Sequence, residues 1–225
     1  LLANRSVAVV VPVRDCERYV AEAIDSILSQ TVTVAEVVVV DDGSRDGTPD
    51  VLAGYGTDIR VERRPARGQF TAMNHGIAVS ESPILGFLDA DDLFTPDSIE
   101  VRLERLLSDD VPDAVFGMTE QFVSPDLGPD DAARLRCEPG PFAVELFQTM
   151  LIRRSAFVRV GPLETGLTTS ANIDWISRMR AAGTRSVHID HVVGRRRLHT
   201  TNVGLTQSAR KRDNLLTVIR THLHR

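Results

Sequence analysis

The sequence predicts an α/β fold in which a mostly parallel central sheet is flanked by helices. Residues 7–11 form an unbroken run of valine and alanine, as expected for a strand that is buried on both faces. Apolar residues then recur at helical spacing, which predicts a helix from about Glu17 to Gln30. A second valine run, residues 37–40, predicts the next buried strand. This strand–helix–strand order is typical of a parallel sheet, because the crossover between parallel strands is usually a helix.

The same alternation continues along the chain and loosens after about residue 111. In the first part we expect a helix over residues 48–53, a strand over 59–62, a helix over 69–79, a strand over 84–88 and a helix over 98–107. In the second part we expect strands near 114–122, 149–153 and 185–193, helices over 173–182 and 207–222, and a proline- and glycine-rich loop over 124–141. We therefore expect one domain over residues 1–225, with a first half over 1–110 and a second half over 111–225 that ends in a helix.

The composition restricts the class of protein. With 42% hydrophobic and 25% charged residues, the chain is expected to bury a full core. A net charge of −5 argues against a nucleic-acid partner. The two cysteines, Cys16 and Cys137, lack metal-ligand spacing, which favours a reduced, cytoplasmic protein. Because no apolar run approaches the length of a transmembrane helix, we expect no integral membrane segment.

Polar clusters follow three of the predicted strands. They are Pro12-Val13-Arg14-Asp15, Asp41-Asp42-Gly43-Ser44 and Asp89-Ala90-Asp91-Asp92. Ligands of open parallel sheets bind at these carboxyl ends, and clustered carboxylates repel one another unless a cation compensates. Hard oxygen ligands suit Mg²⁺ or Mn²⁺, which keep positions open for phosphate oxygens. A single acidic strand end is more often a helix cap or a turn, but two strands that both end in paired aspartates favour a metal and phosphate site.

These stretches resemble the inverting family 2 glycosyltransferases, which have the GT-A fold. The resemblance is carried in order by residues 7–15, 23–30, 37–48, 68–76 and 86–92, and more weakly by 150–154 and 160–163. It implies a nucleotide-sugar-binding half over residues 1–110 and an acceptor-binding half over 111–225. It also implies a metal-dependent transfer of a sugar from a nucleotide-diphosphate donor, with a bias to a UDP-sugar, to a hydroxyl acceptor that the sequence leaves unknown.

The resemblance implies roles on the donor side for the positions that match the family pattern. Those expected to border the nucleotide or its sugar are Pro12, Val13, Arg14, Asp42, Gly68, Asp89 and Ala90. Asp91 is expected to bind the Mn²⁺ or Mg²⁺ that bridges the diphosphate. Asp92 is expected to orient the site or to cap the following turn.

The acceptor side needs a carboxylate that removes the hydroxyl proton, since an inverting enzyme uses one general base. Family members usually carry an acid where this chain has Asn172. Asp174 is therefore our candidate base, at the start of a predicted helix and beside Trp175, which we expect to be a platform for the acceptor. The alternative is that Asp174 only stabilises the helix N-terminus through the helix dipole.

The basic stretch from Arg195 to Asn202 contains an Arg-x-His-x-x-Asn segment that some relatives also have. The resemblance suggests His199 as a further metal ligand and Arg196 or Arg197 as a partner for phosphate. The alternative is a charged sheet edge that prevents aggregation.

Three functions remain to be compared. The first is the glycosyltransferase. The second is a catalytically silent nucleotide-sugar-binding domain, which Asn172 favours. The third is a nucleotidyltransferase, but its glycine-rich loop near the first strand is missing, because residues 14–17 read Arg-Asp-Cys-Glu. A homodimer is the oligomeric state that we consider.

Overall fold

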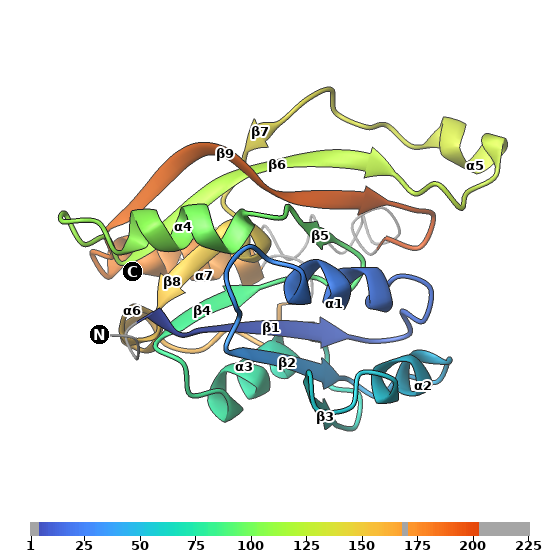
Figure 1. Ribbon diagram of the computed structural model, residues 1–225, viewed down its shortest axis with the longest axis horizontal. Helices are drawn as coiled ribbons and strands as arrows, with labels where there is room; N and C mark the ends of the chain where they lie inside the picture. The colour runs from blue at the N-terminus through green and yellow to red at the C-terminus, as the bar shows by residue number, and fades with distance from the viewer. Residues whose placement is uncertain (1–4, 168–170, 203–225) are drawn as a thin grey trace.

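The computed structural model describes residues 5–167 and 171–202, and its strands form one mixed sheet. Along the chain the strands are β1 (Val7–Val13), β2 (Glu36–Asp41), β3 (Arg60–Arg63), β4 (Ile84–Phe87), β5 (Leu93–Phe94), β6 (Ala114–Val123), β7 (Phe142–Ala143), β8 (Met150–Arg153) and β9 (Ser186–Leu198). In the sheet they lie in the order β3-β2-β1-β4-β8-β6-β9-β5, with β7 beside β6 (Figure 1). The strands β1 to β4 are mutually parallel, and β9 is parallel to β6. The mostly parallel sheet that the sequence predicted is thereby confirmed.

Strand β8 connects the two halves of the chain. It runs antiparallel both to β4, where Leu85 faces Ile152, and to β6, where Val115 faces Leu151. Both halves therefore contribute to one continuous sheet, and the turn that precedes β8 lies at the same edge as the carboxyl end of β4.

Helices cover both faces of the sheet. They are α1 (Val20–Leu28), α2 (Thr48–Ala53), α3 (Gln69–Val79), α4 (Ser98–Leu106), α5 (Pro129–Arg134), α6 (Arg154–Val160) and α7 (Ala171–Ala181). Val9 and Val11 of β1 pack against α1 and α4 on one face, whereas Ala8 and Val10 pack with α3, α6 and α7 on the other. Because successive strand residues point to opposite faces, the continuous apolar run of β1 supplies both layers of the core.

The sequence predicted most elements but not all of their ends. The bounds of α2 and α3 agree with the prediction. Strand β9 runs five residues past its predicted end at residue 193, and a short helix, α5, lies in the segment that we expected to be a loop. The short strands β5 and β7 and the helix α6 were not predicted. The predicted helix over 207–222 lies outside the described residues.

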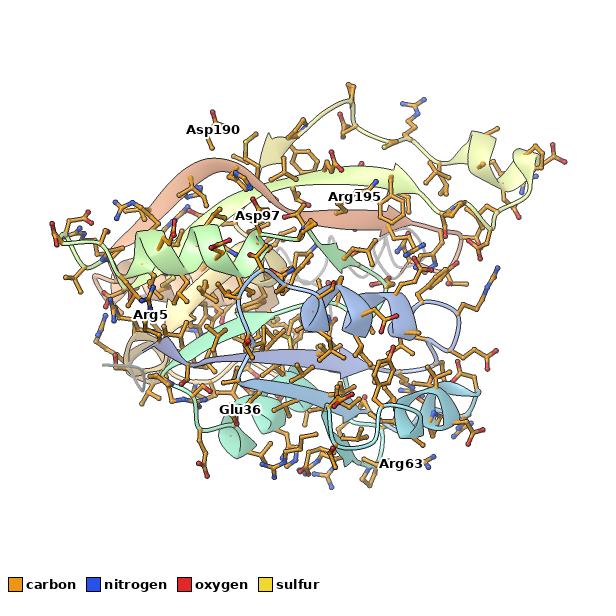
Figure 2. The ribbon with its side chains drawn as sticks, in the orientation of Figure 1. Arg5, Glu36, Arg63, Asp97, Asp190 and Arg195 are labelled. Carbon is orange, nitrogen blue, oxygen red and sulfur yellow. The ribbon has the colours of Figure 1, made fainter. Side chains whose placement is uncertain are left out.

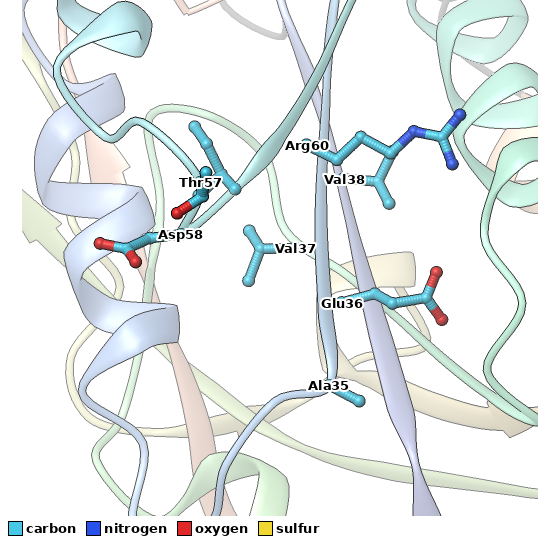
Figure 3. Close-up of a pocket in the computed structure, with 8 residues that line it drawn as sticks. Ala35, Glu36, Val37, Val38, Thr57, Asp58 and Arg60 are labelled. Atoms are coloured by element: carbon cyan, nitrogen blue, oxygen red, sulfur yellow. The ribbon is translucent and has the colours of Figure 1, made fainter.

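A shallow pocket opens at the edge of the sheet opposite to the aspartate clusters (Figure 3). Its lining comes from the amino ends of β2 and β3 and includes Glu36, Asp58 and Arg60. Parallel sheets bind their ligands at the carboxyl ends of strands, so this pocket is not the candidate site. Among residues 5–167 and 171–202, no helix is long and apolar enough to cross a membrane.

Candidate functional site

Hydrogen bonds join the loops that follow β1 and β2 at the carboxyl edge of the sheet. The backbone N–H of Asp15 donates to Ser44 Oγ at 3.0 Å, and the backbone N–H of Arg45 donates to Asp15 Oδ1 at 2.7 Å. Asp15 has a φ of 50°, a left-handed conformation that aspartate tolerates better than most residues. Two of the three polar clusters therefore form one connected rim.

The three residues at the end of β1 lie differently from one another. Pro12 pairs with Val40 inside the sheet, and Val13 is buried. Arg14 points outward with about half of its side chain exposed, and its Nε lies 3.5 Å from Asp15 Oδ2. Of the three, only Arg14 offers a charged group to the rim.

Asp42 is buried and organises the loop in front of α3. Its two carboxylate oxygens accept the backbone N–H groups of Arg67 and Gly68, at 2.8 and 2.7 Å. Gly68 has a φ of 98°, which disfavours any residue with a side chain, and an added Cβ there would meet no described atom within 4 Å. The chain thus holds an open backbone surface immediately before a helix N-terminus, where N–H groups favour an anion.

The acidic loop after β4 is held by side chains on both sides. Gln69 Nε2 donates to Asp89 Oδ1 at 2.8 Å. Asp92 is buried, and its carboxylate accepts the backbone N–H of Arg197 at 2.8 Å and the Nε2 of Gln148 at 2.7 Å. Contacts from α3, from β9 and from the turn before β8 therefore hold this loop in one orientation.

The electrostatics of this loop indicate excess negative charge. Burial and the neighbouring Asp91 raise the pKa of Asp89 to about 7, while Arg196 acts in the opposite direction. The same causes, burial first and then Asp91, raise the pKa of Asp92 well above its ordinary value. A carboxylate cluster whose members resist ionisation in this way is one that a cation would stabilise.

Asp91 and His199 lie next to each other although they come from different halves of the chain. His199 Nε2 lies 2.9 Å from Asp91 Oδ2, and Asn202 Nδ2 lies 3.2 Å from the same oxygen. The His199 Nδ1 is bonded to Thr201 Oγ1 at 2.8 Å, and the ring of Tyr19 packs against the imidazole at 4.7 Å. The imidazole is therefore oriented before any ligand is bound.

Two side chains, Asp91 and His199, are the candidates to hold a metal ion. Within the described part of the chain, no three His, Cys, Asp or Glu side chains are grouped closely enough to hold a metal ion on their own. A carboxylate and an imidazole suit an ion whose remaining ligands are phosphate oxygens and water.

The two arginines that the resemblance suggested as phosphate partners differ in exposure and in contacts. Arg197 is 1% exposed and its guanidinium is bonded to protein groups, so the suggestion that it pairs with phosphate is wrong. Arg196 is half-buried and close enough to Asp89 and Asp92 for its charge to oppose the rise in the pKa of both carboxyls. The alternation of a strand places successive side chains on opposite faces, which explains the difference.

Asp174 and Trp175 are both buried at the start of α7. Arg178 Nε lies 2.9 Å from Asp174 Oδ2 and ties this carboxylate to the following turn of the helix. Trp175 is completely buried, stacks on Phe157 at 4.7 Å and donates its Nε1–H to Gly161 O. Trp175 is therefore a core residue, and the expectation that it forms a platform for the acceptor is wrong.

Asn172 lies at the first turn of α7, one turn before Trp175. Its Nδ2 donates to Glu145 O at 2.9 Å. Its Oδ1 is buried and has no hydrogen-bond partner among the described residues. A buried amide oxygen without a partner costs free energy, so this acceptor is one that a ligand hydroxyl would satisfy.

Comparison with known proteins decides the family. Residues 8–161 match the sequence profile described as Glycosyl transferase family 2. The chain belongs to this family. An uncharacterized glycosyltransferase of Rickettsia typhi is 31% identical over 218 residues, which cover 89% of this chain and 67% of that protein. The hyaluronan synthase of Pasteurella multocida is 33% identical over 123 residues, or 53% of this chain and 13% of the synthase.

The fold of this family 2 domain is also that of a solved glycosyltransferase structure. The S. aureus TarS 1–349 fragment in complex with UDP-GlcNAc matches with a TM-score of 0.73 at 14% identity, over 95% of this chain and 65% of that one. This similarity confirms the GT-A fold. The chain spans only part of the length of TarS and of the Pasteurella synthase.

The family pattern did not identify every residue that shapes the site. Gln69, Gln148 and Tyr19 hold Asp89, Asp92 and His199, but no motif marks them. Asn202 was visible as the last residue of the Arg-x-His-x-x-Asn segment, although no contact with Asp91 was expected.

Proposed function

We propose that this family 2 domain transfers a sugar from a UDP-sugar to an acceptor hydroxyl, with Mn²⁺ or Mg²⁺ held by Asp91 and His199. The observation that carries the proposal is the 2.9 Å contact between His199 Nε2 and Asp91 Oδ2 at the carboxyl edge of the sheet. Two ligands on neighbouring corners of an octahedron, each about 2.1 Å from the ion, are about 3 Å apart. The separation of the two atoms would therefore suit two ligands of one ion.

When bound, the ion supplies positive charge that stabilises the diphosphate leaving group. The residues of the chain would position the donor. Asp42 holds the Gly68 backbone in front of α3, and Asp89, which accepts a hydrogen bond from Gln69, would face the ribose or the sugar. Arg196 would add a cation on the diphosphate side, since Arg197 is buried. The UDP and UDP-GlcNAc bound in the TarS structures support a UDP-sugar as donor.

On the acceptor side we keep Asp174 as the proposed base, because it is the one carboxylate in the sequence of α7. Its ion pair with Arg178 must open or shift for the carboxylate to reach a hydroxyl. The second candidate is a silent nucleotide-sugar-binding domain. It is favoured by Asn172, an amide that can bind a hydroxyl but cannot take its proton.

Calorimetric titration with UDP, in Mn²⁺ and separately in EDTA, tests the donor site. We expect Mn²⁺ to tighten UDP binding by at least about ten-fold, since the ion links carboxylate to diphosphate. Equal affinity in both buffers would contradict the metal assignment. Release of UDP from a panel of UDP-sugars then separates the two candidates, because the silent domain binds donors without turnover.

A further inference from the structure

Arg197 carries a buried positive charge behind the proposed metal site. Its side chain is 1% exposed, and its guanidinium lies 4.8 Å from the ring centroids of both Tyr19 and Phe122. A guanidinium is planar and weakly hydrated, so stacking it between two aromatic rings costs less desolvation free energy than burying an ammonium group there. The two rings fix the plane of the Arg197 guanidinium and thereby the direction of its N–H groups.

The N–H groups of this guanidinium donate hydrogen bonds to three separate parts of the fold. Nε donates to the backbone carbonyl of Asp91 at 3.0 Å, Nη1 to Ser124 Oγ at 3.3 Å, and Nη2 to Glu22 Oε2 at 2.8 Å. Glu22 belongs to α1 and Ser124 follows β6. The carbonyl of Asp91 is thus connected through one side chain to helix α1 and to the end of strand β6.

The backbone of Arg197 is attached to the same loop. Its N–H donates to Asp92 Oδ1 at 2.8 Å, and its carbonyl accepts from Asn202 Nδ2, which also lies 3.2 Å from Asp91 Oδ2. The backbone N–H of His199 donates to Asn202 Oδ1 at 2.6 Å. The peptide of Arg197 therefore links the loop that carries Asp91 to the turn that carries His199.

We propose that Arg197 is a positioning residue that sets Asp91 and His199 at the separation a divalent ion requires. This inference rests on the proposed function of that pair. Without the stacked guanidinium, the Asp91 carbonyl loses its connection to α1 and β6, and the part of the acidic loop that carries Asp91 is held less firmly against the turn. Lysine keeps the charge but has neither the planar guanidinium nor its five donors, so Arg197→Lys removes the side-chain part of the positioning while it retains the cation and the backbone contacts of residue 197.

The matched control is Arg195→Lys. Arg195 lies on β9 (Figure 2), two residues before Arg197 in the sequence, and it also packs over the Phe122 ring at 4.8 Å. Its side chain is paired with Glu120 and is more than two-fifths exposed, and among the described residues it makes no hydrogen bond or ion pair with the acidic loop. A third variant, Glu22→Gln, removes the outer partner of Arg197 at a side chain that is 58% exposed, and it tests the same connection without disturbing the core.

The first measurement is amide hydrogen exchange of the metal-free proteins, followed over peptides that cover residues 88–94 and 196–202. We expect Arg197→Lys to speed exchange in both peptides by at least about ten-fold, with a smaller effect in the same direction for Glu22→Gln and none for Arg195→Lys. Unchanged exchange at both peptides in Arg197→Lys overturns the proposal, as does a uniform increase over the whole chain, which would mean a purely structural role.

The second measurement is the Mn²⁺ concentration that half-saturates UDP binding. We expect Arg197→Lys to raise it by about ten-fold or more, to leave UDP binding in EDTA within about two-fold, and to bind UDP normally at saturating Mn²⁺. The same half-saturation in Arg197→Lys as in Arg195→Lys overturns the proposal. If the unaltered protein binds UDP equally well with and without Mn²⁺, the metal assignment fails, and the exchange experiment alone then decides whether Arg197 positions the loop.

Discussion

His199 Nε2 lies 2.9 Å from Asp91 Oδ2, and the two residues are 108 positions apart in the sequence. The acidic loop after β4 supplies one member and the turn after β9 supplies the other. The proposed metal site is therefore complete only when both halves of the chain are folded together.

His199→Ala removes one of the two proposed ligands. We expect it to weaken the Mn²⁺-dependent part of UDP binding by about 10- to 100-fold, and to leave UDP binding in EDTA nearly unchanged. Calorimetry in the two buffers measures both quantities. His191→Ala serves as the control, because His191 pairs with Asp97 at the surface and does not contact the acidic loop. A loss of equal size in EDTA would show that His199 acts on the nucleotide and not through a metal.

The role of α7 is tested by two opposite substitutions. If Asp174 is the base, Asp174→Asn lowers the rate of sugar transfer by at least about 100-fold and leaves donor binding unchanged. If the chain is silent because of Asn172, then Asn172→Asp creates transfer activity that the unaltered protein lacks. UDP release at saturating donor measures both. Normal turnover in Asp174→Asn contradicts the base assignment.

The pH dependence of the metal-free protein follows from the raised pKa of Asp89, which is about 7 when folded against 3.8 for an unperturbed aspartate. Between these values the folded protein binds a proton that the unfolded chain does not, so the free energy of unfolding falls as the pH rises through this window. Urea unfolding in EDTA at about pH 5, 6, 7 and 8 measures it. Asp89→Asn should make the free energy of unfolding depend less on pH. If the free energy of unfolding of the unaltered protein rose with pH between about 5 and 7, the assignment of this pH dependence to Asp89 would be wrong.

Trp175 stabilises the layer formed by α6 and α7. We expect Trp175→Ala to lower the free energy of unfolding by about 3–5 kcal/mol, because it removes a completely buried ring and leaves a cavity. Ile173→Ala, at a neighbouring side chain that is 49% exposed, should change it by less than about 0.5 kcal/mol. Urea unfolding of both variants gives the comparison. Equal effects would mean that Trp175 is not packed as described.

The two cysteines should react at different rates. Burial and the nearby Asp91 raise the pKa of Cys16 to about 12, whereas Cys137 is exposed. The thiolate is the reactive form, so at about pH 8 iodoacetamide should modify Cys137 at least about ten-fold faster than Cys16. Peptide mapping by mass spectrometry follows both sites, and unfolding in urea should abolish the difference.

The fold was predictable where one local pattern determines the structure. Runs of valine indicate strands buried on both faces, and the continuing alternation of strand and helix segments along the chain located α2 and α3. The paired aspartates at strand ends indicated the carboxyl edge of the sheet, where we propose the donor site, because parallel strands of one sheet end at one edge.

What could not be predicted depends on contacts between distant residues. The last five residues of β9 include three arginines and therefore look polar in the sequence. Arg197 is nevertheless buried there, between the rings of Tyr19 and Phe122. Trp175 stands beside a polar helix start, and only the packing of Phe157 against it shows that it faces the core. Neither the burial of Arg197 nor that of Trp175 produces a periodic pattern in the sequence.

The position of β8 also has a consequence for the synthesis of the chain. Strand β4 ends at residue 87, but the strand that covers its open edge begins only at residue 150. While a ribosome is still producing the intervening segment, the nascent sheet exposes an apolar strand with unpaired backbone groups, a template for pairing with another chain. Chaperone demand during translation is therefore expected to be greatest in that interval, and truncation near residue 110 should yield aggregates in place of an isolated donor-binding half.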